Sequence, residues 1–122
     1  MSKLILCFVL LFNIYICEEI KQVRTFEEKD LGKELHIRLG EEFAIKTKGA
    51  VLGTVYWGFT NKEETKEFVQ YLRRDYEKGY HYHYFKAIKV TNGPLSLTFS
   101  RLILLVKPTG NPPTITFKIN VK

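Results

Sequence analysis

The chain has 122 residues, a formal net charge of +6 at pH 7 and 45% hydrophobic residues. This length allows one domain. Both cysteines, Cys7 and Cys17, lie close to the N-terminus, so the rest of the chain has no disulfide, no thiol catalysis and no cysteine-ligated zinc. Acidic and basic residues are interspersed, as in residues 63–67, which favours a solvated surface over a basic binding face.

The first residues have the pattern of a secretory signal peptide. A short positively charged opening is followed by an apolar run, Leu4–Cys17, that ends at two glutamates. The run is shorter than the roughly 20 apolar residues of a membrane-spanning helix. We therefore expect residues 1–17 to be cleaved, and the protein to be secreted or held in endomembrane or lysosome-like vesicles, with no stable membrane association. An uncleaved anchor and a buried N-terminal strand are the alternatives.

The middle of the chain alternates between apolar and polar residues with a period of two, which is typical of half-buried strands. Residues 18–33 are polar and predict an N-terminal arm before this pattern begins. Two alternating stretches on either side of Gly40 predict a hairpin-like pair. A loop bracketed by Gly49 and Gly53 then leads to an aromatic run that favours a strand. The strands expected in this half cover residues 35–39, 43–46 and 54–59.

Residues 60–76 are ambiguous between a helix and a strand. Thr60 and Glu63 have the spacing of a capping box, and Phe68, Tyr71 and Leu72 recur at helical spacing. This favours one amphipathic helix of about three turns near residues 61–74. A strand over residues 68–72 is the alternative.

The C-terminal part predicts further strands over residues 80–90, 95–106 and 115–121, separated by glycine- and proline-containing turns. On the first of these strands we expect Tyr80, Tyr82 and Tyr84 to pack against a second sheet, which leaves His81 and His83 on the outer face. Six or seven short strands at regular spacing predict an immunoglobulin-like antiparallel β-sandwich over residues 34–122.

Nothing in the sequence indicates an enzyme or a cofactor. Outside the N-terminal run there are two aspartates, Asp30 and Asp75, and no serine in a nucleophile elbow or glycine-rich phosphate loop. His81 and His83 would point to the same side of a strand, but no third metal ligand accompanies them, so we expect no metal site. A pH-dependent contact by these histidines is a stronger alternative. The tyrosines between them resemble a nucleic-acid stacking platform, but expected secretion and core packing argue against nucleic acid.

The order of motifs resembles the chagasin-like family of cysteine peptidase inhibitors. A G-E-x-F-x-I stretch ending at Ile45, a glycine-ended loop and an aromatic run follow one another as they do in that family. Gly53 matches the closing glycine of the family's first binding loop, and Trp57 follows one place late. Gly79 matches one glycine of the second loop. For the third loop, Arg101 matches the arginine of R-P-W, and Lys107 with Pro108 is the alternative.

The resemblance implies a non-enzymatic protein that blocks the active-site cleft of a papain-like cysteine peptidase without a covalent bond. The binding loops would meet at one end of the sandwich. The resemblance places Gly49, Ala50, Val51, Leu52, Gly53, Gly79, Arg101, Lys107 and Pro108 in these loops. A secreted immunoglobulin-like recognition or adhesion module is the alternative function, because a fold does not dictate a function.

Overall fold

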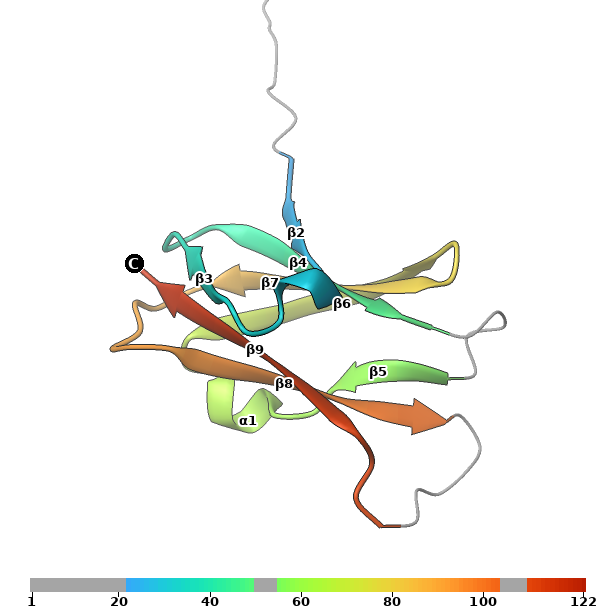
Figure 1. Ribbon diagram of the computed structural model, residues 1–122. Coiled ribbons are helices and arrows are strands. Elements are labelled where there is room, and N and C mark those ends of the chain that lie inside the picture. The colour runs from blue at the N-terminus through green and yellow to red at the C-terminus, as the bar shows by residue number, and fades with distance from the viewer. Residues whose placement is uncertain (1–21, 50–54, 104–109) are drawn as a thin grey trace, which may run out of the picture.

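A computed structural model describes residues 22–49, 55–103 and 110–122, which fold as two four-stranded sheets packed face to face (Figure 1). The first sheet has the order β2-β4-β7-β6 and the second has the order β3-β9-β8-β5. The expected signal peptide, residues 1–17, lies outside the described residues. The strands are β2 (Arg24–Phe26), β3 (Glu34–Ile37), β4 (Glu42–Lys48), β5 (Val55–Phe59), β6 (Val69–Glu77), β7 (Tyr80–Ala87), β8 (Leu95–Ile103) and β9 (Thr114–Val121), with a 3-10 turn at Glu28–Asp30 and a single-turn helix α1 at Lys62–Thr65.

The core lies between the sheets and is rich in aromatic rings. Phe43 and Phe85 stack within the first sheet at 5.4 Å, and Phe99 and Phe117 meet edge to face in the second at 5.8 Å. Phe59 joins the two sheets, because its ring lies 5.0 Å from Phe85 and 5.5 Å from Phe99. The expected immunoglobulin-like sandwich is therefore confirmed, and its core is closed without any disulfide among the described residues.

The expected hairpin around Gly40 is wrong, because its two strands belong to different sheets. β3 runs parallel to β9, and β4 runs antiparallel to β7 and parallel to β2. Ile37 and Phe43, on either side of the turn, are both buried, but they enter the core from opposite sheets. The alternation identified both strands correctly and carried no information on which partner each one takes. The sandwich is accordingly mixed, with two parallel pairs.

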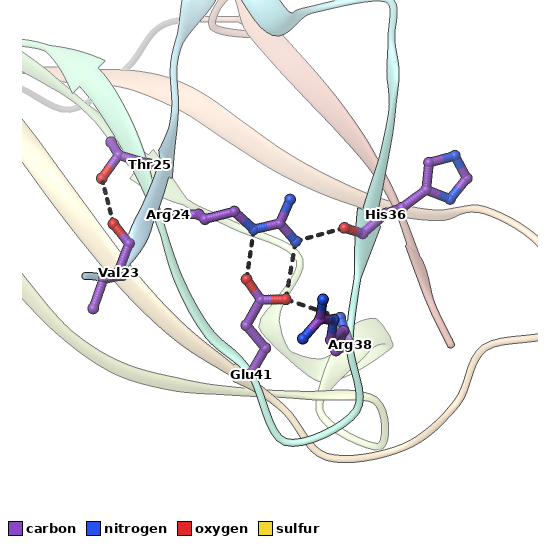
Figure 2. Close-up of polar contacts among 6 residues, drawn as sticks. All are labelled: Val23, Arg24, Thr25, His36, Arg38 and Glu41. Carbon is purple, nitrogen blue, oxygen red and sulfur yellow. Dashed lines mark hydrogen bonds and ion pairs between the residues drawn. The ribbon is translucent and has the colours of Figure 1, made fainter. Parts of the chain in front are cut away.

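Part of the expected N-terminal arm belongs to the first sheet and is fastened by an ion pair (Figure 2). Arg24 of β2 donates two hydrogen bonds to the Glu41 carboxylate, at 2.6 and 2.9 Å, and one to the backbone oxygen of His36 at 2.6 Å. The backbone N–H of Arg38 also donates to Glu41. These bonds hold the pKa of Glu41 below its ordinary value and tie β2 to the β3–β4 turn.

The three-turn helix expected near residues 61–74 is reduced to the four residues of α1, and a nine-residue strand, β6, follows it. The expected capping box does not form: Thr60 donates its hydroxyl to Thr98 of β8, and the N-cap position is held by Asn61. Asn61 instead extends the sheet. Its amide donates to the Ser96 carbonyl at 2.7 Å and accepts from the Thr98 N–H at 2.9 Å, as a strand peptide would. The strand alternative for residues 68–72 is the correct one from residue 69 onward.

No helix within the described residues is long and apolar enough to span a membrane.

Candidate functional site

Strand ends from both sheets lie together at one end of the sandwich, which we call the loop end (Figure 1). Here β4 ends at Lys48, β5 begins at Val55, β6 and β7 are joined by a turn, and β8 ends at Ile103. The registers agree with this view, because Lys48 pairs with Tyr80 and Val55 pairs with Ile103. We define the loop end by Gly49, Val55, the turn at residues 78–79, and Ile103.

The turn between β6 and β7 is a tight two-residue hairpin. Lys78 has a φ of 51° and Gly79 a φ of 87°, the two positive values that a type I′ turn requires. The N–H of Gly49 donates to the carbonyl of Gly79 at 2.8 Å. The first and second predicted loops are therefore fastened to one another at their base, which limits the entropy that a partner's binding would cost.

The His81 ring packs close to Gly49, the donor of this hydrogen bond. A Cβ atom added at Gly49 would lie 2.8 Å from Cδ2 of the His81 ring and 3.0 Å from its Nε2. The ring also packs against Tyr76 at 4.8 Å and Tyr56 at 5.4 Å between centroids. His81 is only 4% exposed, and neither ring nitrogen has a hydrogen-bond partner among the described residues. Burial and the nearby Arg74 lower its pKa below the ordinary value.

His83, the next inward residue of β7, is buried in a different way. Its Nε2 lies 3.1 Å from the Thr47 hydroxyl and its Nδ1 lies 3.0 Å from the Tyr71 hydroxyl. A neutral imidazole has one donor and one acceptor nitrogen, and two hydroxyls satisfy both. Burial, Arg74 and His81 together lower the pKa of His83 to about 3, so the ring is neutral over the physiological range.

These positions correct the expected faces of β7. His81 and His83 face the core, and the tyrosines that alternate with them, Tyr80, Tyr82 and Tyr84, lie on the outer face with greater exposure. The reason lies further along the strand: Phe85 and Ala87 share the histidine face, and placing the tyrosines inward would have buried Lys86 with them. Among the described residues no group of three potential ligands is placed to hold a metal ion.

A β-bulge in β6 adds further side chains to the site. Tyr71 pairs with Phe85, but the next pair is Arg73 with Tyr84, so Leu72 is an extra residue. After the bulge, Arg74 and Tyr76 pair with the inward-facing histidines of β7. The Arg74 guanidinium then lies 4.3 Å from the Tyr56 ring. It joins β6 to β5, the edge strands of the two sheets, across the open side of the sandwich.

Large exposed apolar side chains gather at the loop end. Tyr76 is 44% exposed, Tyr80 37% and Ile103 46%. The half-buried Trp57 lies two positions along β5 from Val55, opposite Arg101. Tyrosine, tryptophan and arginine are enriched among the residues that dominate binding energy in protein interfaces.

The predicted loop residues fall into three groups. Gly49 and Gly79 lie at the loop end. Arg101 lies there too, but it is an exposed residue of β8 rather than a loop residue, and its N–H donates to the Pro113 carbonyl at 3.0 Å. The remaining residues, Ala50, Val51, Leu52, Gly53, Lys107 and Pro108, lie outside the described residues.

Sequence reasoning missed several residues of this end: Arg74, Tyr76, Tyr80 and Ile103 were not among the expected site residues. For Tyr76 and Tyr80 a signal existed, because both flank the glycine turn that was placed in a binding loop. Arg74 carried no such signal, because the bulge that places it opposite His83 is not visible in the sequence.

Comparison with solved structures supports the fold. The structure is similar to the crystal structure of the cysteine protease inhibitor EhICP2 from Entamoeba histolytica, with a TM-score of 0.66, 12% identity, and coverage of 82% of this chain and 95% of that one. It is also similar to the solution structure of amebosin, with a TM-score of 0.54, 17% identity, and coverage of 84% and 100%. No protein-family model and no curated protein sequence matches the chain. The resemblance to chagasin-like inhibitors is thus confirmed at the level of the fold.

Proposed function

We propose that the protein is a secreted or vesicular inhibitor of papain-like cysteine peptidases, which it binds through the loop end without forming a covalent bond. One observation carries the proposal: residues that the sequence resemblance assigns to separate binding loops, Gly49 and Gly79, are fastened together in a fold shared with a cysteine protease inhibitor. Arg101 lies at the same end.

Such an inhibitor needs no nucleophile, metal or cofactor. It needs a rigid body that presents backbone and apolar side chains to a cleft, so that little conformational entropy is lost on docking. The fastened turn supplies the rigid base, and the exposed side chains of Tyr80 and Ile103 supply apolar area beside it. The similarity in fold to EhICP2, a cysteine protease inhibitor, supports the same interpretation.

The test is inhibition of papain by the purified protein, together with an alanine substitution at each end of the sandwich. Ile103→Ala removes an exposed side chain from the loop end and should weaken inhibition about fivefold or more, the size expected for an interface residue worth about 1 kcal/mol. The matched control is Ile88→Ala. Ile88 is 45% exposed, close to the 46% of Ile103, but it follows β7 at the opposite end.

Ile88→Ala should leave the inhibition constant unchanged. Equal effects of the two substitutions would show that the loop end is not the binding surface. A folded wild-type protein that leaves papain and other papain-like peptidases fully active at micromolar concentration would remove the inhibitor hypothesis.

The outer face of the first sheet supports a second candidate, a recognition module without inhibitory activity. Tyr80, Tyr82 and Tyr84 form a row there, and cations lie over their rings: Lys46 is 4.2 Å from the Tyr80 ring and Arg73 is 4.0 Å from the Tyr84 ring. Tyrosines beside cations are common in protein recognition surfaces. If Tyr82→Ala abolishes binding to a natural partner and Ile103→Ala does not, this candidate replaces the first.

A further inference from the structure

The side chain of His81 lies where it can act on both Gly49 and Gly79. Its ring lies against the backbone of Gly49, and Gly49 is hydrogen-bonded to Gly79. The ring fills this space so closely that even a methyl group at Gly49 would overlap it at 2.8 Å. Any displacement of the ring therefore moves the base of the loop end.

Among the described residues, the charged group that acts on His81 is the positively charged Arg74, and no carboxylate acts on it. Arg74 and Tyr76 face it from β6, Tyr56 faces it from β5, and His83 follows it on β7. On β4 its cross-strand partner is the uncharged Thr47. Arg74 is the only charged group among the described residues with an electrostatic effect on His81, and it opposes protonation.

Because of these neighbours, the site accommodates the neutral ring of His81 better than the protonated ring. The neutral ring stacks between Tyr76 and Tyr56 and leaves both nitrogens without a partner. A protonated ring in the same place would be a buried cation beside a guanidinium, without a carboxylate to pair with it. A displacement of the protonated ring would alter its close packing against Gly49, where an added Cβ would lie 2.8 Å from the ring.

We propose that His81 is a pH-sensing positioning residue of the loop end: its neutral ring holds Gly49 in place beside Gly79, and its protonation in acid loosens this arrangement. The expected consequence, that peptidase binding weakens as the pH falls, rests on the proposed function. His83 does not share this role, because its two hydroxyl partners hold it in the core.

The direction follows from proton linkage. Burial lowers the pKa of His81, so the folded loop end resists protonation until the pH falls below the ordinary value of 6.5. A partner that covers the loop end binds the neutral form better and must expel the proton from the charged form. Between pH 7.5 and 5.0 the inhibition constant should rise by about 3- to 30-fold, where the upper figure is the limit set by one proton and a pKa of 6.5.

The experiment compares the purified wild-type protein with His81→Phe, which keeps an aromatic ring and removes the titration. Inhibition constants for papain are measured at pH 7.5 and 5.0, and the ratio for each protein is compared, so that the pH dependence of papain itself cancels. His36→Gln is the matched control, because His36 is an exposed histidine of β3. His81→Leu replaces His81→Phe if the latter does not fold.

A second readout needs no peptidase. Trp57 is the only tryptophan of the chain, and its neighbour Tyr56 contacts His81. Its fluorescence should change with a midpoint below pH 6.5 in the wild type and in His36→Gln, and should stay constant in His81→Phe. Thermal unfolding at pH 5.0 confirms that each protein is still folded.

The outcomes separate the two proposals. If no papain-like peptidase is inhibited at either pH, but the Trp57 transition occurs and is lost in His81→Phe, the inhibitor function fails and the switch stands. If inhibition falls equally in acid for the wild type and His81→Phe, or if the Trp57 transition persists in His81→Phe, the switch is overturned.

Discussion

At the scale of single residues, Gly49 and Gly79 are both needed at the loop end, but for different physical reasons. Gly79 has a φ of 87° and open space around its Cα, so a side chain there is resisted by backbone conformation. Gly49 has no such backbone constraint, and a side chain there is resisted by the His81 ring. The chain thus uses one glycine for a turn and the other for a close approach.

This difference predicts a coupling between positions 49 and 81. Gly49→Ala should destabilise the protein by about 1–3 kcal/mol, the usual cost of adding volume to a packed site. In a His81→Ala background the same change should cost less by at least about 0.5 kcal/mol, because the obstructing ring is gone. The measurement is urea unfolding of the four proteins of the double-mutant cycle.

Gly79→Ala is the control for that cycle. It should cost about 1–2 kcal/mol from its left-handed backbone, and by the same amount in both backgrounds. Coupling of equal size at positions 49 and 79 would contradict the steric explanation.

At the scale of elements, Asn61 closes the first turn after β5 by acting as an extra strand residue. Asn61→Ala removes both of its bonds to β8 and leaves the Ser96 carbonyl and the Thr98 N–H without that partner. We expect a loss of about 1–3 kcal/mol in unfolding free energy. Asn61→Asp keeps the acceptor for the Thr98 N–H and loses the donor to the Ser96 carbonyl. Its unfolding free energy should therefore lie between those of the wild type and Asn61→Ala. An Asp variant weaker than the Ala variant would contradict this role.

The element that sequence reasoning misjudged most, β6, shows why periodicity has a limit. The residues on the histidine face of the sheet are Val69 and Tyr71 before the bulge, and Arg74 and Tyr76 after it. One extra residue therefore changes a spacing of two into a spacing of three, which imitates the period of a helix. A bulge forms only when a strand pairs with another strand, and the sequence of one strand alone does not show how it pairs.

For β7, in contrast, the sequence does indicate which face of the strand is buried. Its tyrosine and histidine faces are equally plausible over residues 80–84, but Phe85, Lys86 and Ala87 decide between them. The pairing of β3 with β9 and of β4 with β2 had no such signal, because alternation specifies which face is buried and not which strand lies beside it. The loop end was predictable for Gly79, whose turn chemistry is local, and not for Arg74.

At the scale of the whole molecule, the two ends of the sandwich have different constructions. The end opposite the loops is closed by backbone bonds, from Leu39 to Lys122 and from Gly40 to Ala87, and by the Arg24–Glu41 ion pair. Within the described residues, the loop end is held by the backbone bonds from Gly49 to Gly79 and from Arg101 to Pro113, and by packing on a histidine. A partner or a change of pH therefore has more freedom to alter the loop end than the end that holds the N-terminal strand.

The same buried histidines make the whole fold sensitive to acid, and His83 sets the size of the effect. Its pKa is 6.5 in the unfolded chain and about 3 in the folded one, so between these values the unfolded chain binds a proton that the folded chain does not. The stability from this group is fully present above pH 6.5 and falls by about 1.4 kcal/mol for each pH unit below it. From pH 7.5 to 5.0 the wild type should lose about 2 kcal/mol through His83 alone. Urea unfolding at the two pH values measures this loss.

His83→Phe is the variant that isolates the effect. It should be less stable than the wild type at pH 7.5, because Thr47 and Tyr71 lose their partner, yet it should lose about 2 kcal/mol less on going to pH 5.0. His36→Gln should lose as much as the wild type. Glu41 does not enter this comparison, because its lowered pKa affects stability only below its ordinary value of 4.5. A His83→Phe protein with the full wild-type loss between pH 7.5 and 5.0 would show that His83 is not held neutral in the fold.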